Sequence, residues 1–135
     1  MNERKKELKK SYQQSDKPMG IYQIRNQVNG KIFIGYAQDL QAIFNSNRFQ
    51  LKMNGHTNKA LQKEWNEFGE VAFVFEILDE LKPKPGQSPN YLSELKELHQ
   101  LWLDNLEPYG EKGYHAKPIS REERLAMMAK NRDGN

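Results

Sequence analysis

The chain has 135 residues, 36% of them hydrophobic, which is enough for one modest core and predicts a single folded domain. It contains no cysteine, which excludes disulfide bonds, thiolate catalysis and cysteine-ligated zinc, and no apolar run long enough to cross a membrane, so we expect a cytoplasmic protein. The formal net charge of +3, from 21 basic and 18 acidic residues, is compatible with a nucleic-acid partner but too small to predict one.

The first 16 residues predict a basic arm rather than part of a core. Lysines occupy four of the positions from 5 to 10, and Leu8 is almost the only aliphatic side chain, so a helix here would bury little. Such an arm can contact phosphate groups, or it can be a solvated leader. We therefore expect a basic arm at 1–16, a domain at 17–116 and a C-terminal helical tail at 117–135.

Two β-rich runs after Pro18 predict an antiparallel hairpin. The runs cover 20–26 and 31–37, and the Asn29-Gly30 pair between them favours a type I′ turn. A third apolar run at 73–78 predicts the remaining strand of a small three-stranded antiparallel sheet.

Two amphipathic stretches between these strands predict helices. The first begins near Asp39, and the second runs from about Asn58 to Gly69; aspartate and asparagine are good N-cap residues, and glycine often ends a helix. In the second stretch, Trp65 lies on the apolar side, so we expect it to pack in the core and not to stack on bases.

Two more helices are predicted after the third strand. The prolines at 83, 85 and 89 predict a loop, and the helix that follows, at about 91–106, places His99 on its apolar stripe. We expect His99 to face inward. The last helix, at 121–130, has Ser120 and Glu123 spaced as a capping box.

The order of these elements and the paired motifs at 20–22 and 33–35 resemble the GIY-YIG endonuclease family. The first motif reads Gly-Ile-Tyr and the second Phe-Ile-Gly, and further matches continue in order over roughly residues 18 to 115, at His56, in the segment at 65–69 and at Gly113-Tyr114. The resemblance implies an α/β domain in which helices flank the small antiparallel sheet. It also implies an ancestral activity, the hydrolysis of phosphodiester bonds.

The resemblance further implies a set of site residues. In the family, two tyrosines orient and deprotonate the attacking water, an arginine stabilises the phosphate charge, and a glutamate holds a divalent cation; a histidine and an asparagine complete the site. Of these, Tyr22 and His56 keep the expected residue types and are our candidate catalytic residues.

Five matched positions depart from the family. Phe33 replaces the second tyrosine, Ile43 the arginine, and His99 the metal-binding glutamate. Asn47 stands where a further histidine is common, and His115 replaces the asparagine. The changes at 43 and 99 remove one charge of each sign, so the pocket can stay folded without an unpaired buried charge. This pattern predicts a pseudoenzyme whose hydrolysis is lost or much reduced.

All three histidines of the chain fall on matched positions. If His56, His99 and His115 converge, they would suit zinc, nickel or manganese better than magnesium. The alternative is a neutral, hydrogen-bonded polar pocket, so the only cofactor we consider is a divalent metal at these residues.

Candidate nucleic-acid contacts lie on the hairpin and beside the two middle helices. They are Arg25, Arg48, Lys52 and Lys59. These cations can follow a phosphate backbone, or they can simply form a solvated face.

The main functional hypothesis is therefore a GIY-YIG-like protein that binds DNA or another nucleic acid. One alternative is an active DNA endonuclease with a rearranged or transition-metal site. The other is a protein-interaction module on the same scaffold, because fold alone does not fix function.

Overall fold

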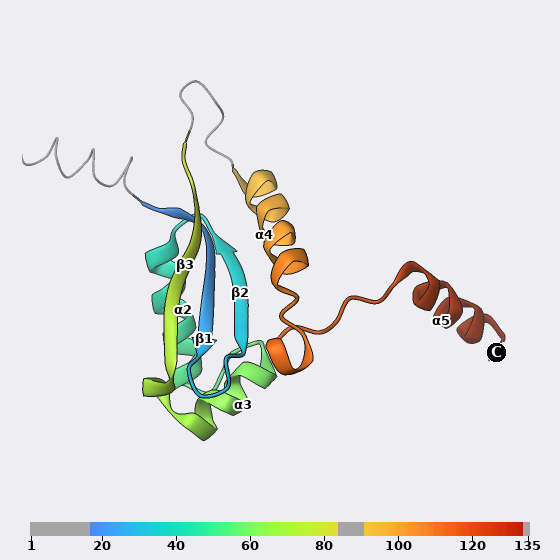
Figure 1. Cartoon of the computed structure of the whole chain (residues 1–135), viewed down its shortest axis with the longest axis horizontal. Helices are drawn as coiled ribbons and strands as arrows, with labels where there is room; N and C mark the ends of the chain where they lie inside the picture. The colour runs from blue at the N-terminus through green and yellow to red at the C-terminus, as the bar shows by residue number, and fades with distance from the viewer. Residues whose placement is uncertain (1–16, 84–90, 134–135) are drawn as a thin grey trace, which may run out of the picture.

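Three antiparallel strands form the centre of the molecule, which we describe from a computed structural model over residues 17–83 and 91–133. The strands are β1 (Met19–Asn26), β2 (Ile32–Ala37) and β3 (Phe73–Leu81), in the spatial order β2-β1-β3 (Figure 1). The predicted hairpin and third strand are confirmed, but the turn is not of type I′: Gly30 has a positive φ of 76°, whereas Asn29 does not, and a type I′ turn needs a positive φ at both positions. The proposed basic arm and most of the proline-rich loop lie outside the described residues.

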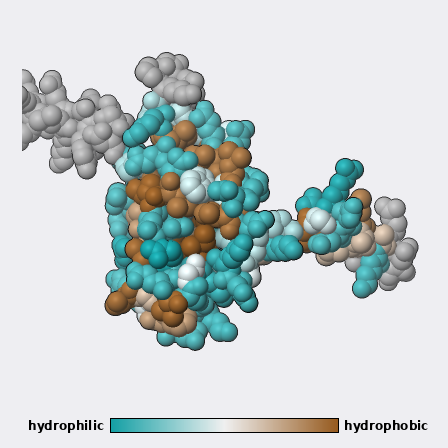
Figure 2. All heavy atoms as spheres, in the orientation of Figure 1, coloured by the Kyte–Doolittle hydropathy of each residue, from teal (hydrophilic) through white to brown (hydrophobic). Residues whose placement is uncertain are grey.

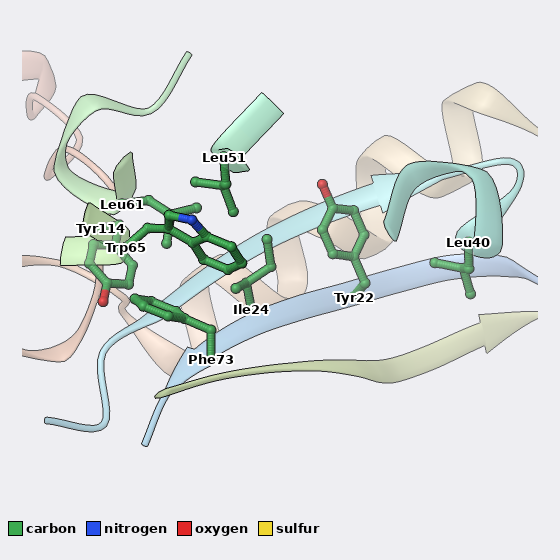
Figure 3. Close-up of a cluster of buried hydrophobic side chains, with 8 residues drawn as sticks. All are labelled: Tyr22, Ile24, Leu40, Leu51, Leu61, Trp65, Phe73 and Tyr114. Atoms are coloured by element: carbon green, nitrogen blue, oxygen red, sulfur yellow. The ribbon is translucent and has the colours of Figure 1, made fainter. Parts of the chain in front are cut away.

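One face of the sheet carries the main apolar core. Tyr22 and Ile24 of β1 point toward α2 (Leu40–Lys52) and α3 (Lys59–Phe68), because alternate residues of a strand share a face. Figure 3 shows Trp65 of α3 packed over Ile24, beside Phe73. Trp65 is buried, as predicted.

The helix caps in this layer are the ones that the sequence predicts. The Asp39 side chain accepts a hydrogen bond from the Ala42 amide at 3.1 Å, and the Asn58 side chain accepts one from the Leu61 amide at 3.0 Å. Each cap satisfies an amide that has no partner within its own helix. Together they fix where α2 and α3 begin relative to the sheet.

The opposite face of the sheet is covered by α4 (Leu92–Leu106). Ile21 and Leu95 are fully buried, and the Trp102 indole nitrogen donates to Asp79 of β3 at 3.1 Å. Because Asp79 is the register partner of Ile21, this bond places α4 over that part of the sheet. The helix thus brings His99 beside the sheet, within 5.0 Å of the Tyr36 ring centroid.

Short elements connect and extend this core. The 3-10 helix η1 (Glu70–Ala72) precedes β3, and η2 (Gly110–Lys112) follows α4. The chain then pairs with β2 through a parallel bridge between Ile32 and Gly113. The last helix, α5 (Arg121–Asp133), begins at the predicted Ser120 cap and stands apart from the sheet (Figure 1). None of the helices described here is long and apolar enough to span a membrane.

Candidate functional site

The Phe33 ring lies at the centre of the positions that the family resemblance assigns to catalysis. Its centroid is 6.3 Å from that of Tyr22, 5.5 Å from that of His56 and 5.0 Å from that of His115, on which it stacks. Residues from β1, β2, the loop before α3 and the segment after η2 therefore converge. Three other positions that the family resemblance assigns to the site thus lie around the Phe33 ring.

A buried hydrogen-bond chain joins Tyr22 to His56 through Asn47. The Asn47 Nδ2 atom lies 3.2 Å from the Tyr22 hydroxyl and 2.8 Å from the Ile43 carbonyl oxygen. On its other side, Asn47 Oδ1 lies 2.6 Å from His56 Nε2. At most 5% of any of the three residues is exposed, so water cannot replace these partners.

The partners along these hydrogen bonds determine the orientation of the Asn47 amide and the tautomer of His56. The Ile43 carbonyl can only accept, so Asn47 Nδ2 must be the atom that faces it, and Asn47 Oδ1 must accept from His56. The Asn58 amide donates to His56 Nδ1 at 3.0 Å. The imidazole is therefore neutral and carries its hydrogen on Nε2. Neither of its ring nitrogens is free to take a proton from Tyr22.

Burial opposes ionisation at both ends of the chain. It raises the pKa of Tyr22 above its usual value, although the hydrogen bond from Asn47 acts in the opposite direction. Burial also lowers the pKa of His56, and the nearby Lys59 ammonium acts in the same direction. Tyr22 thus stays a phenol and His56 stays neutral near pH 7, so this pocket is polar but uncharged.

Gly35 makes room for the Tyr22 ring. The two residues are register partners on adjacent strands, and a Cβ atom at position 35 would lie 2.4 Å from the tyrosine Cζ and hydroxyl oxygen. A contact that short is not possible between atoms that are not bonded to each other. The glycine of the second motif is therefore required by the packing of the tyrosine in the first.

The other two histidines bind the backbone of the β2 edge. The Ile34 amide donates to His115 Nε2 at 2.8 Å, and His99 Nε2 donates to the Ile34 carbonyl oxygen at 3.2 Å. Burial, together with the charge of His99, lowers the pKa of His115 to about 4. His99 does face inward, as predicted, but it faces a backbone oxygen.

These contacts do not form the three-histidine metal site that we considered. His56 uses both ring nitrogens within the protein, and His99 and His115 each use Nε2 on Ile34. In the part of the chain that the structure covers, no group of three His, Cys, Asp or Glu residues could hold a metal ion. A magnesium site also needs oxygen ligands, whereas the family resemblance assigns its carboxylate position to His99. The residues present therefore do not fit the cation that the family resemblance implies.

The candidate nucleic-acid contacts do not form one surface. Arg25 forms an ion pair with Glu76 at 2.8 Å on the α4 side of the sheet. Arg48 and Lys52 both lie within 3.8 Å of Glu70, and the Arg48 guanidinium stacks 4.5 Å from the Phe75 ring centroid. Of the four, only Lys59 has no carboxylate within 4.0 Å in the described residues.

Two residues that hold the site in place were not among our candidates. Gln62 accepts a hydrogen bond from the His56 amide at 3.0 Å and donates to the Leu51 carbonyl oxygen at 3.0 Å. Asn58 caps α3, binds His56 Nδ1 and also donates to the Tyr114 carbonyl oxygen at 3.0 Å. The available signal was a glutamine next to Leu61 on the apolar side of a helix, where a buried polar group needs partners.

Known proteins resemble this chain in both sequence and structure. Intron-associated endonuclease 1 of Enterobacteria phage T4 is 36% identical over 62 residues, which are 46% of this chain and 25% of that protein. The match thus spans only a quarter of the phage protein's length. No protein-family model matches the chain.

The structural similarity extends further than the sequence match. The catalytic domain of the homing endonuclease I-TevI superposes with a TM-score of 0.61 and 26% identity, over 74% of this chain and 99% of that domain. A mutant of the I-TevI catalytic domain superposes with a TM-score of 0.60 and 28% sequence identity, over 73% of this chain and 92% of that domain. The three-stranded antiparallel sheet and its flanking helices are thus those of this nuclease domain. The chain is a GIY-YIG-like protein.

Proposed function

We propose that this domain binds nucleic acid and has lost most or all phosphodiester hydrolysis by the usual route of the family. The observation that carries the proposal is the position of the Asn47 amide between the Tyr22 hydroxyl and His56. An amide nitrogen donates a hydrogen bond but does not accept a proton. Among the described residues, Tyr22 therefore has no hydrogen-bonded general base to activate it.

The residues around Tyr22 also lack groups that stabilise a phosphate. Hydrolysis of a phosphodiester builds negative charge, which enzymes stabilise with cations or metal ions. The family resemblance assigns Phe33 and Ile43 to the positions of a tyrosine and an arginine, and His99 to the position of the carboxylate. Binding of nucleic acid needs none of these groups, and both similar proteins are named as endonucleases.

A cleavage assay tests the proposal directly. Supercoiled plasmid and branched DNA should show no nicking above background in magnesium, manganese, nickel or zinc, while a gel-shift assay should still show binding. Magnesium-dependent nicking that disappears in Tyr22→Phe would overturn the proposal. The matched control is Tyr36→Phe. It also removes a tyrosine hydroxyl, from a position on β2 opposite Ile21, and leaves the hydrogen bonds between Tyr22, Asn47 and His56 intact.

One observation favours a second candidate, an endonuclease with a rearranged site. Tyr22 and His56, which keep the family's residue types, are joined by a single intervening side chain. For this candidate, cleavage should fall in His56→Gln as well as in Tyr22→Phe. The same assay therefore separates the two hypotheses.

A further inference from the structure

The charges of the folded domain and of the C-terminal segment have opposite signs. The domain, counted over 17–83 and 91–116, contains 10 basic and 12 acidic residues, a net charge of −2. Residues 117–130 contain 4 basic and 2 acidic residues, a net charge of +2. A polyanion is therefore repelled by the domain as a whole and attracted by the segment that carries α5.

Ion pairing strengthens this difference. Seven cations of the described residues lie within 4.0 Å of a carboxylate, and all belong to the domain or its edges: Lys17, Arg25, Lys31, Arg48, Lys52, Lys82 and Lys112. The cations of 117–130 have no such partner among the residues described. Their charge remains available to phosphate groups.

One side of α5 combines the two arginines of this segment with apolar side chains. Arg121, Arg124, Leu125 and Met128 are spaced i, i+3, i+4 and i+7, which places them on one face of a helix. Glu122 and Glu123 fall outside this face. Leu125 is 55% exposed and Met128 is 56% exposed, and Figure 2 shows apolar atoms among the hydrophilic ones of this segment.

We propose that this face of α5 is the main docking surface for double-stranded DNA, an inference that rests on the proposed function. An α-helix fits the major groove of B-form DNA, where arginines reach the phosphates and apolar side chains contact base edges. Within the described part of the chain, α5 stands apart from the sheet and its covering helices (Figure 1), and its apolar face is exposed to a partner. The charge of the face selects a polyanion as that partner.

A binding titration with two matched variants tests the inference. A fluorescent random-sequence duplex is titrated by anisotropy against the parent, Arg121→Gln/Arg124→Gln, and the control Lys82→Gln/Lys96→Gln. Both variants remove two positive charges, but the control removes them from the sheet domain. Glutamine is a good helix former, and circular dichroism verifies that the helix content is unchanged.

The arginine variant should bind at least about tenfold more weakly. The plot of log K against log salt should also become less steep, by about 1.8 in the magnitude of its slope, because each lost phosphate contact removes about 0.9. The control should stay within about twofold of the parent, since the phosphates do not contact those lysines. A third variant, Leu125→Ser/Met128→Ser, should weaken binding without changing the slope.

The possible failures are distinguishable. If the parent binds neither duplex nor single-stranded nucleic acid at low salt, the proposed function fails. If the parent binds and the arginine variant has the same affinity and slope, only the α5 inference is overturned. An equal loss in the control would also overturn it, because the effect would then be one of net charge. A preference for single-stranded DNA or for duplex RNA over duplex DNA would contradict docking in the DNA major groove.

Discussion

The inner face of the sheet near β2 and the outer edge of β2 use histidine in different ways. On the inner face, His56 is 2% exposed, and each ring nitrogen has one protein partner. At the outer edge, His99 and His115 are only partly buried and bind the amide and carbonyl groups of Ile34. The inner chain ties side chains from several elements together, whereas the outer pair substitutes for a missing neighbouring strand.

This difference predicts unequal costs of mutation. A buried polar group that loses its partner retains its full desolvation cost, whereas a group near the surface can bind water instead. Changes to the inner chain should therefore destabilise the fold more than changes at the edge. The following experiments test that order, from the largest expected effect to the smallest.

The largest effect is expected for Asn47→Leu. The substitution keeps the side-chain volume similar but leaves the His56 Nε2 hydrogen and the Tyr22 hydroxyl without their partner. The free energy of unfolding should fall by about 4 kcal/mol, measured by urea denaturation. Asn45→Leu, on an exposed position of the same helix, is the control and should change stability by less than about 1 kcal/mol. Equal stability of the two variants would show that the buried chain contributes nothing.

A smaller loss is expected for Gly35→Ala. The added methyl group overlaps the Tyr22 ring, so the ring or the strand must move, at a cost of about 2 to 3 kcal/mol. Combining the change with Tyr22→Leu should recover part of this loss, because the shorter side chain vacates the overlap. Additive effects in the double mutant would contradict the contact.

His115 at the edge of β2 should make the free energy of unfolding depend on pH in the acid range. Because the pKa of His115 falls from 6.5 in the unfolded chain to about 4 in the folded one, the unfolded state binds more protons between these values. Stability should therefore decrease as pH falls from 6.5 to 4, by on the order of 2 kcal/mol from this residue.

The matched variant for the acid effect is His115→Gln. Its amide oxygen can still accept from the Ile34 amide but does not titrate in this range. The decrease between pH 6.5 and 4 should be shallower in the variant than in the parent. Parallel curves, measured by urea denaturation at each pH, would exclude His115 as the source.

The smallest effect is expected for His99→Leu. It removes one donor to a carbonyl oxygen near the surface and should cost about 1 kcal/mol in the free energy of unfolding. His99→Gln keeps a donor and should lie between the parent and the leucine variant. A loss as large as that of Asn47→Leu would break the proposed distinction between face and edge.

The features predicted correctly from the sequence are those that depend on neighbouring residues. Asp39, Asn58 and Ser120 cap helices because each accepts from an amide three residues away. The hairpin position was also predicted, but its type I′ geometry was wrong, because Asn29 lacks the positive φ that this turn requires. The grouping of Tyr22, Phe33 and His56 came from the family resemblance and not from spacing alone.

The features that were missed depend on contacts distant in sequence. Nothing local indicates that the segment at 113–115 returns to the β2 edge, so the bonds of His99 and His115 to Ile34 were not predictable. The pairing of Arg25 with Glu76 joins residues 51 positions apart, so it was not predictable from neighbouring residues either. The third strand also continues to Leu81, because Asp79 and Glu80 extend the pairing with β1.

The occupied edge of β2 also bears on how the protein behaves in concentrated solution. An open strand edge is a template on which a second chain can add, and this route leads to aggregation. At neutral pH the amide and carbonyl of Ile34 already have imidazole partners, which protect this border of the sheet. Protonation of His115 removes the acceptor from the Ile34 amide. Storage in mild acid should therefore promote self-association before it unfolds the domain.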